Sequence, residues 1–293
     1  MSLGGWMLDS EVTDFHSEGG ICSYGVQLTG NGPIRLIRTK ITDGTLHGNV
    51  DPSAPILDKS GCTTPVIEDC EISRNTNYNG AAAAGVLSLN ATGHYVSFTR
   101  CRCTDNAARH GVLRGGSSNP YNNMLYATNC LFARNVCIPP RYGTGSGKYT
   151  DLFWARGEYV NCTIADNGSE GDVLVFNCIG REDRQHQIYF QNTVISGNDV
   201  IGTYASGGNV PTTTHSIYPE AVEGDGDLTG PARFIGRGRD PYRLAAGSPG
   251  VGAGALLGWT KDDTDLIGNR RVQGGAVDMG CYQSTTGMML LVQ

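Results

Sequence analysis

The chain has 293 residues, of which 17% are charged and 42 are glycine, and its formal net charge is −6. An acidic balance without clustered Lys and Arg gives no electrostatic attraction to nucleic acid or to an anionic membrane surface, which argues against a nucleic-acid partner. No apolar run approaches the ~20 residues that span a bilayer, and residues 1–8 lack the basic and long apolar regions of a secretory signal. The sequence therefore fits a cytoplasmic or virion protein, or a piece cut from a longer secreted chain.

A short pattern returns seven times between residues 10 and 198: a small residue, a spacer, an apolar residue, two spacers and usually an asparagine. Each repeat contains short β-rich runs separated by Gly, Asn, Asp and Ser, without helical periodicity. Strands that recur once per repeat can stack in parallel only if the chain winds as a coil. The repeat therefore predicts an all-β parallel β-helix over residues 1–208, with about seven coils of ~31 residues. Its small residues are Ser10, Thr39, Cys70, Cys101, Cys130, Cys162 and Thr193.

Residues at the same repeat position should form columns along the coil, about 4.8 Å apart. The small column is expected inside with two apolar columns, whose burial is the main stabilising term. The spacers between them, among them Glu11, Lys40, Glu71, Arg102 and Thr163, are expected to point outward because side chains alternate along a strand.

A column of asparagines is expected where the strand bends, hydrogen-bonded along the axis and in the left-handed conformation that a bend requires. Because every turn carries the residue, we interpret it as a structural ladder, made of Asn75, Asn106, Asn135, Asn167 and Asn198.

The four column cysteines, Cys70, Cys101, Cys130 and Cys162, are expected to be free buried thiols. Parallel Cβ vectors disfavour a disulfide between neighbouring turns, and a single-file column cannot surround a metal ion tetrahedrally. The cysteines off the column have no assigned partners and are Cys22, Cys137, Cys178 and Cys281.

A candidate binding face comes from four runs that stack on the coil, beginning at Val86, Val112, Leu152 and Val173. If Leu113 and Phe153 point inward, then Arg114 and Trp154 point outward, with Arg156 following on the same outer face. An indole flanked by guanidinium groups suits a sugar ring with an acidic substituent, because the ring stacks and the anion takes bidentate hydrogen bonds. An Arg stem lying over Trp on an ordinary surface remains the alternative. Further contacts expected near this face are Arg109, Arg141 and Tyr142, from the Gly-rich insertion at residues 138–148 or beside it.

The same surface also carries candidates for a catalytic site. Hydrolysis requires two converging carboxylates, one with a raised pKa, and elimination requires a base beside a neutralised carboxylate, often with calcium. The sequence shows neither a cluster of neighbouring aspartates nor a clear calcium-ligand set, so we expect no cofactor, with calcium left open. The weak catalytic candidates are His110, Lys148, Asp151 and Glu158.

After about residue 208 the repeat stops, and a different segment runs over residues 209–293. It contains Tyr242-Arg-Leu, Gly247-Ser-Pro, Gly268-Asn-Arg, Gly274-Gly and Val277-Asp-Met-Gly, followed by Cys281-Tyr. These motifs resemble the end of bacterial choice-of-anchor Q proteins, which are right-handed parallel β-helix proteins of the pectate-lyase-like superfold. The match covers roughly residues 212–283 and departs at Gly252, Cys281 and Gln283. The resemblance implies a β-rich segment that caps the end of the helix, and a secreted or cell-surface protein, but it supplies no reaction.

Family members begin with an N-terminal cap strand, which is not recognisable before Trp6. The resemblance therefore implies either a truncated chain or a first coil that stacks on a partner. We expect a non-catalytic extracellular or cell-surface module that displays a carbohydrate- or protein-binding face. The alternatives are a polysaccharide lyase or glycoside hydrolase on the same fold, and a phage or other assembly component.

Overall fold

A computed structural model describes most of the repeats and nearly all of the C-terminal segment. Within that part the regular elements are β-strands, and no helix is long and apolar enough to cross a membrane. The described residues are 5–18, 26–29, 34–47, 57–61, 65–78, 86–89, 95–108, 113–115, 124–138, 153–154, 156–169, 188–199, 211–219 and 224–285.

The strands form four sheets, and every pairing within them is parallel. The eight-stranded sheet comprises, in spatial order, β1 (Trp6–Leu8), β5 (Arg35–Ile37), β9 (Val66–Glu68), β13 (Tyr95–Thr99), β17 (Met124–Thr128), β21 (Arg156–Val160), β24 (Ile188–Gln191) and β26 (Thr212–Thr214). The nine-stranded sheet comprises β2 (Glu11–Thr13), β6 (Lys40–Thr42), β10 (Glu71–Ser73), β14 (Arg102–Thr104), β18 (Leu131–Ala133), β22 (Thr163–Ala165), β25 (Val194–Ser196), β27 (Ile217–Tyr218) and β28 (Leu228–Thr229).

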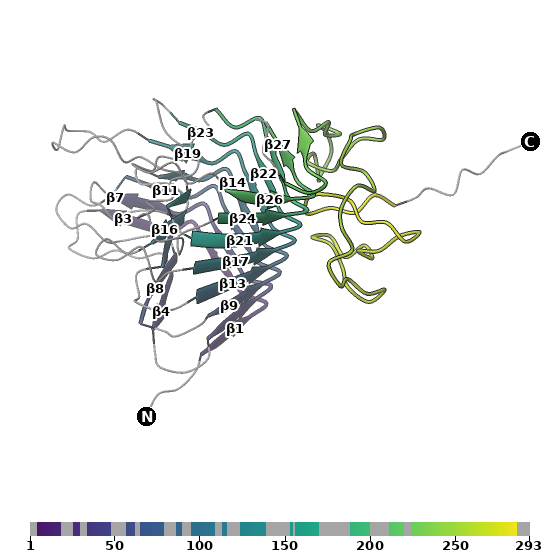
Figure 1. Cartoon of the computed structure of the whole chain (residues 1–293). Coiled ribbons are helices and arrows are strands. Elements are labelled where there is room, and N and C mark those ends of the chain that lie inside the picture. Colours follow the sequence, from purple (N-terminus) through teal and green to yellow (C-terminus); the bar gives the residue numbers. More distant parts are fainter. Residues whose placement is uncertain are drawn as a thin grey trace, which may run out of the picture.

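Two smaller sheets continue the circuit of the earlier coils (Figure 1). The six-stranded sheet comprises β3 (His16–Glu18), β7 (Thr45–His47), β11 (Thr76–Asn77), β15 (Ala107–Ala108), β19 (Val136–Cys137) and β23 (Gly168–Ser169). The five-stranded sheet comprises β4 (Val26–Thr29), β8 (Leu57–Gly61), β12 (Leu87–Leu89), β16 (Leu113–Gly115) and β20 (Phe153–Trp154).

The predicted fold class is confirmed, because each strand pairs with its equivalent one repeat later. Ile72, for example, lies between Ile41 and Cys103 in the register of the nine-stranded sheet. The coil also extends further than predicted. Ser216 continues the small column, since its hydroxyl oxygen accepts a hydrogen bond from the Thr193 amide at 3.0 Å, and β26 and β27 form an eighth coil.

The predicted inner columns fill the core. Leu36, Ile67, Phe98 and Tyr159 are almost completely buried, as are the column cysteines. Cys70, Cys101, Cys130 and Cys162 are free thiols, as predicted, and Cys281 is also free and buried. Burial raises the pKa of the Cys101 and Cys130 thiols well above the usual range, which keeps them protonated and unreactive. Ser10, in the first coil, is only half-buried.

The asparagine ladder forms as predicted, at the corner between the nine-stranded and six-stranded sheets. Except at Asn198, which ends the ladder, each Nδ2 group donates to the Oδ1 atom of the next asparagine, at 3.0 Å from Asn75 to Asn106 and 2.9 Å from Asn135 to Asn167. One expectation was wrong: the left-handed residue at this corner is the one before each asparagine, for example Arg74 (φ 55°) and Asp105 (φ 58°). The asparagine itself satisfies buried backbone groups, whereas the left-handed residue points to solvent.

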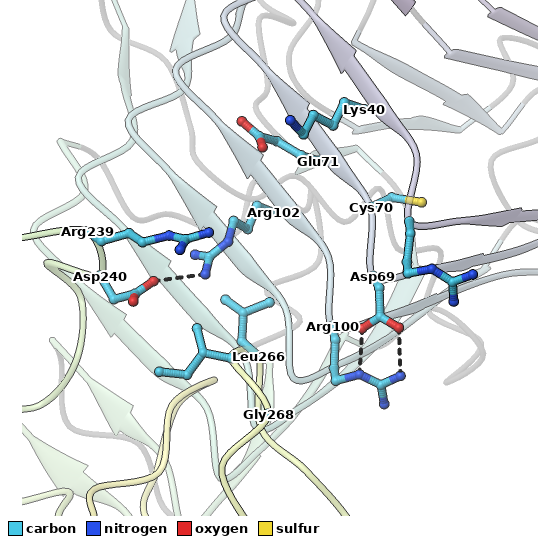
Figure 2. A pocket seen from close by; sticks show the side chains of 12 residues that line it. Lys40, Asp69, Cys70, Glu71, Arg100, Arg102, Arg239, Asp240, Leu266 and Gly268 are labelled. Atoms are coloured by element: carbon cyan, nitrogen blue, oxygen red, sulfur yellow. Dashed lines mark hydrogen bonds and ion pairs between the residues drawn. The ribbon is translucent and has the colours of Figure 1, made fainter. Parts of the chain in front are cut away.

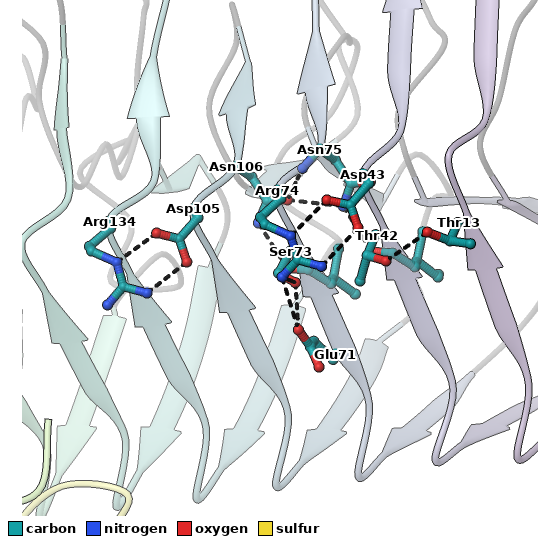
Figure 3. Close-up of polar contacts among 12 residues, drawn as sticks. Thr13, Thr42, Asp43, Glu71, Ser73, Arg74, Asn75, Asp105, Asn106 and Arg134 are labelled. Carbon is teal, nitrogen blue, oxygen red and sulfur yellow. Dashed lines mark hydrogen bonds and ion pairs between the residues drawn. The ribbon is translucent and has the colours of Figure 1, made fainter. Parts of the chain in front are cut away.

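Those left-handed corner residues pair along the axis. Arg74 donates from Nε and Nη2 to the two oxygens of Asp43 at 2.7 and 2.8 Å, and Arg134 binds Asp105 in the same bidentate way (Figure 3). These hydrogen bonds hold the pKa of Asp43 below its usual range. Because both partners are exposed, each pair contributes little to stability.

The C-terminal segment lies beside the coil (Figure 1). At the corner between the eight-stranded and nine-stranded sheets, Asn129 donates to the Thr264 carbonyl at 2.9 Å, Asn161 to that of Asp278 at 3.0 Å, and Asn192 to that of Ala255 at 2.7 Å. The sequence placed this segment on the end of the helix, whereas these contacts fix it along the side of coils five to seven. The exact domain boundary stays a prediction.

The motifs that carry the family resemblance hold this segment together. The buried carboxylate of Asp265 accepts hydrogen bonds from the backbone amides of Asn269 and Gln283, both at 2.8 Å. Buried Arg271 donates to the carbonyls of Asp278 and Gly280, and burial lowers its pKa to about 10. These polar residues therefore have structural roles within the segment.

Candidate functional site

The outer face of the nine-stranded sheet changes character halfway along the coil. Its spacer column begins with charged residues, Glu11, Lys40, Glu71 and Arg102, which are paired in register. It continues with buried Leu131, Thr163, Val194 and Ile217. Thr163 was predicted to point to solvent. It is buried because Cys281 and its neighbours cover it, and its Oγ1 accepts a hydrogen bond from the Cys281 amide at 3.1 Å.

A cleft of about 480 Å³ opens where the charged half of this face meets the edge of the C-terminal segment (Figure 2). Strands β6, β10 and β14 form its floor, the corner before β10 and β14 forms one side, and the loop around residues 266–268 forms another. The lining residues are Arg38, Lys40, Asp69, Cys70, Glu71, Arg100, Arg102, Arg239, Asp240, Leu266, Ile267 and Gly268.

Three of the five cations in the cleft are held by carboxylates. Arg100 donates to the two oxygens of Asp69 at 2.7 and 3.0 Å and to Glu68 at 2.6 Å. Arg38 binds Asp9 in the same bidentate manner. The hydrogen bonds that Arg38 and Arg100 donate to these carboxylates raise the pKa values of both guanidinium groups, so both stay charged.

Arg102 connects the sheet to the C-terminal segment. Its Nη2 donates to Asp240 at 2.8 Å, its Nη1 donates to the Tyr282 hydroxyl at 3.0 Å, and its guanidinium lies 5.9 Å from the centre of the Tyr282 ring. Only a quarter of the Arg102 side chain is exposed, so its charge is mostly committed to this contact.

Lys40 and Arg239 are the two cations left over. Both are exposed, and neither has an ion-pair partner within the described residues. Glu71, the carboxylate next to Lys40 in register, is engaged by Ser73 Oγ at 2.6 Å and lies 3.6 Å from Arg74. The walls carry five cations and three carboxylates, and Asp9 and Glu68 pair with Arg38 and Arg100 from outside the lining, so the positive charges left without an ion-pair partner in the described part of the chain are those of Lys40 and Arg239. Such a surface attracts an anion.

The described part of the chain does not show the arrangements that hydrolysis requires. The carboxyl groups with shifted pKa values, Asp9, Asp43 and Asp263, are all shifted downward, mainly by hydrogen bonds from Arg38, Arg74 and Thr260. A general acid would need the opposite shift. No group of three or more His, Cys, Asp or Glu side chains that could hold a metal ion occurs among those residues.

The predicted binding residues are only partly brought together. Arg114 in β16 pairs in register with Trp154 in β20 and with Ser88 in β12, as the stacking of these runs predicted. Arg156 belongs instead to β21, in the eight-stranded sheet, opposite Met124. Glu158 is half-buried two residues further along the same strand. The candidates outside the described residues are Arg109, His110, Arg141, Tyr142, Lys148 and Asp151.

The sequence did not predict the cleft, although it did predict that the residues of the cleft floor point outward. Lys40, Glu71 and Arg102 were placed on the outside, but the wall that converts this face into a cleft comes from residues 239–240 and 266–268. One sequence signal was available: the spacer column changes from charged residues to Leu131 and Val194, which indicates that something covers the later coils.

The fold defines the molecule as a parallel β-helix protein. The sequence matches no protein-family model and none of the curated proteins compared with it. A solved structure with a similar path is the crystal structure of pectate lyase Pel9A, with 13% sequence identity and a TM-score of 0.40 over 94% of this chain and 86% of that chain. A likeness this distant assigns no ligand and no reaction to this chain, and the choice-of-anchor Q resemblance stays a prediction.

Proposed function

We propose that this chain is an extracellular or cell-surface β-helix module that binds an acidic polysaccharide without cleaving it. The observation that carries the proposal is the pair of uncommitted cations, Lys40 and Arg239, in the cleft beside the C-terminal segment. A uronate carboxylate or a sulfate group would interact with the Lys40 ammonium as a point charge and with the Arg239 guanidinium through paired hydrogen bonds. Leu266 and Ile267 supply apolar surface for the sugar ring.

Binding can be measured by isothermal titration calorimetry against polygalacturonate, heparin and a neutral glucan at low and high salt. We expect the acidic polymers to bind and the affinity to fall with salt, because exposed charges are screened. Lys40→Gln and Arg239→Gln should each weaken binding by about fivefold, which corresponds to ~1 kcal/mol for one ionic contact.

Lys261→Gln provides the matched control, because Lys261 is exposed on the C-terminal segment but does not line the cleft. Equal binding by the wild type and both cleft variants would refute the site. The polymers are also weighed by mass spectrometry after incubation with and without calcium. Shortening of any polymer would replace the binding module with the lyase or hydrolase alternative.

A second candidate face rests on the register pairing of Arg114 with Trp154. Adjacent coils bring these two positions about 4.8 Å apart along the axis, and an indole beside a guanidinium suits a sugar ring with an acidic substituent. Trp154→Ala should weaken binding of the same acidic polymers if this face is used. Unchanged affinity in that variant would leave the cleft as the binding site.

A further inference from the structure

A separate group of aromatic residues lies on the outer face of the eight-stranded sheet. In β13 and β17 buried residues alternate with exposed or half-buried ones, so Tyr95 and Tyr126 point away from the core. The register then places Glu158 of β21 directly beside Tyr126, and Tyr189 of β24 on the far side of Glu158. This row is on a different sheet from the cleft.

The two tyrosines of β13 and β17 form an exposed aromatic corner. Half of the Tyr95 surface is exposed, and its ring lies 5.6 Å from that of Tyr126, at an interplanar angle of 67°. An edge-to-face pair of this kind holds both rings in fixed orientations. The corner therefore presents two π-faces that are already ordered before any ligand arrives, which reduces the entropic cost of binding.

The chemistry of the row favours a neutral sugar. Glu158 is half-buried between two tyrosines, and a carboxylate at that position repels an acidic polymer but accepts hydrogen bonds from sugar hydroxyl groups. Tyr126 and Tyr189 are two strands apart, or roughly 10 Å. That distance is comparable to the length of a disaccharide in an extended β-1,4-linked chain.

We propose that this face binds a neutral, extended polysaccharide in which one pyranose ring stacks on the Tyr95–Tyr126 corner, the ring one disaccharide further along lies at Tyr189, and the hydroxyl groups between them hydrogen-bond to Glu158. The inference does not depend on the cleft, because the two surfaces share no residue. It also predicts an affinity that does not fall with salt, since stacking is not screened by ions.

The test is calorimetric titration with neutral β-1,4-linked hexasaccharides, namely cellohexaose, xylohexaose, mannohexaose and N-acetylchitohexaose, at high salt to suppress binding in the cleft. The wild type should bind at least one of them. Tyr95→Ala, Tyr126→Ala and Glu158→Gln should each weaken that binding by about three- to tenfold, as expected for the loss of one ring contact or one charge-assisted hydrogen bond.

Tyr78→Ala is the matched control, because Tyr78 is also half-buried on the outside of the coil and stacks on His47 with ring centres 4.6 Å apart. Circular dichroism confirms that each variant is folded. The proposal is overturned if no neutral hexasaccharide binds, if the Tyr78 variant loses as much affinity as the Tyr126 variant, or if binding vanishes at high salt. None of these results bears on the acidic polymers, so failure here is distinguishable from failure of the cleft.

Discussion

Replacing Asn135 with alanine removes a rung in the middle of the asparagine ladder. The Asn135 side chain is fully buried and makes four hydrogen bonds. Its Nδ2 donates to the Cys103 carbonyl and to Asn167 Oδ1, both at 2.9 Å. Its Oδ1 accepts from the Asn106 backbone amide at 3.2 Å and from Asn106 Nδ2 at 3.0 Å.

The cost of this substitution follows from those contacts. Each hydrogen bond is worth about 1 kcal/mol net, so the loss of four amounts to about 4 kcal/mol. Asn198→Ala is the comparison, because Asn198 ends the ladder and is only half-buried. It makes three such bonds, to Asn167 and Ile164, and water can replace part of them. We expect a loss of about 1–2 kcal/mol there.

The assay is urea unfolding of both variants and the wild type, followed by circular dichroism and by tryptophan fluorescence. If both probes give one transition, the free energies of unfolding can be compared directly. If the two probes give two transitions, the free energies of unfolding are compared for the transition that circular dichroism reports, because that signal comes mainly from the strands of the coil. A cost for Asn135→Ala no greater than for Asn198→Ala would refute the view that the ladder satisfies buried polar groups.

Three further predictions concern the docking of the C-terminal segment, the thiols and the corner ion pairs. Asn161→Ala should destabilise that docking by about 2 kcal/mol, because buried Asn161 bonds Asp278 and Trp259 of the segment, whereas Asn129→Ala should lose about 1 kcal/mol for its single bond to Thr264. Limited proteolysis within residues 230–285 measures the difference, and equal protection of the two variants would contradict it. Cys101 and Cys130 should resist iodoacetamide in the native protein and react fully in urea, as read by peptide mass spectrometry; native labelling would show that the column is accessible. The folded pKa of Asp43 lies below its unfolded value of 3.8, so its contribution is present above that pH and is lost as the pH falls through the folded value. The decrease in Tm between about pH 5 and pH 3 should therefore be smaller in Asp43→Asn than in the control Asp262→Asn, and equal slopes would argue against the Asp43–Arg74 pair.

Most of the fold could be read from the repeat, because a periodic sequence puts the same residue in the same environment on every turn. Small residues such as Cys130, apolar residues such as Ile72 and ladder residues such as Asn106 were therefore assigned correctly from position alone. The eighth coil was missed because Ser216 follows Thr193 by 23 positions, which breaks the regular interval.

The candidate site was harder to predict, because it depends on contacts between segments far apart in the sequence. Arg102 and Asp240 are 138 residues apart, and no periodic pattern relates them. The sequence suggests that Arg156 and Trp154 share a face because they are only two residues apart. Between them, however, the chain passes from the five-stranded to the eight-stranded sheet, so Trp154 pairs with Arg114 and Arg156 pairs with Met124.

The sequence by itself determined the coil, its inner columns and its asparagine ladder, since these follow from local strand periodicity repeated at a fixed interval. Only the tertiary structure decided where the C-terminal segment docks. That docking buries Thr163, commits Arg102 to Asp240 and leaves Lys40 and Arg239 facing an open cleft. The physical reason is that the segment has no repeat of its own, so its position is set by complementarity with the apolar half of one sheet, which exists only once the coil is wound.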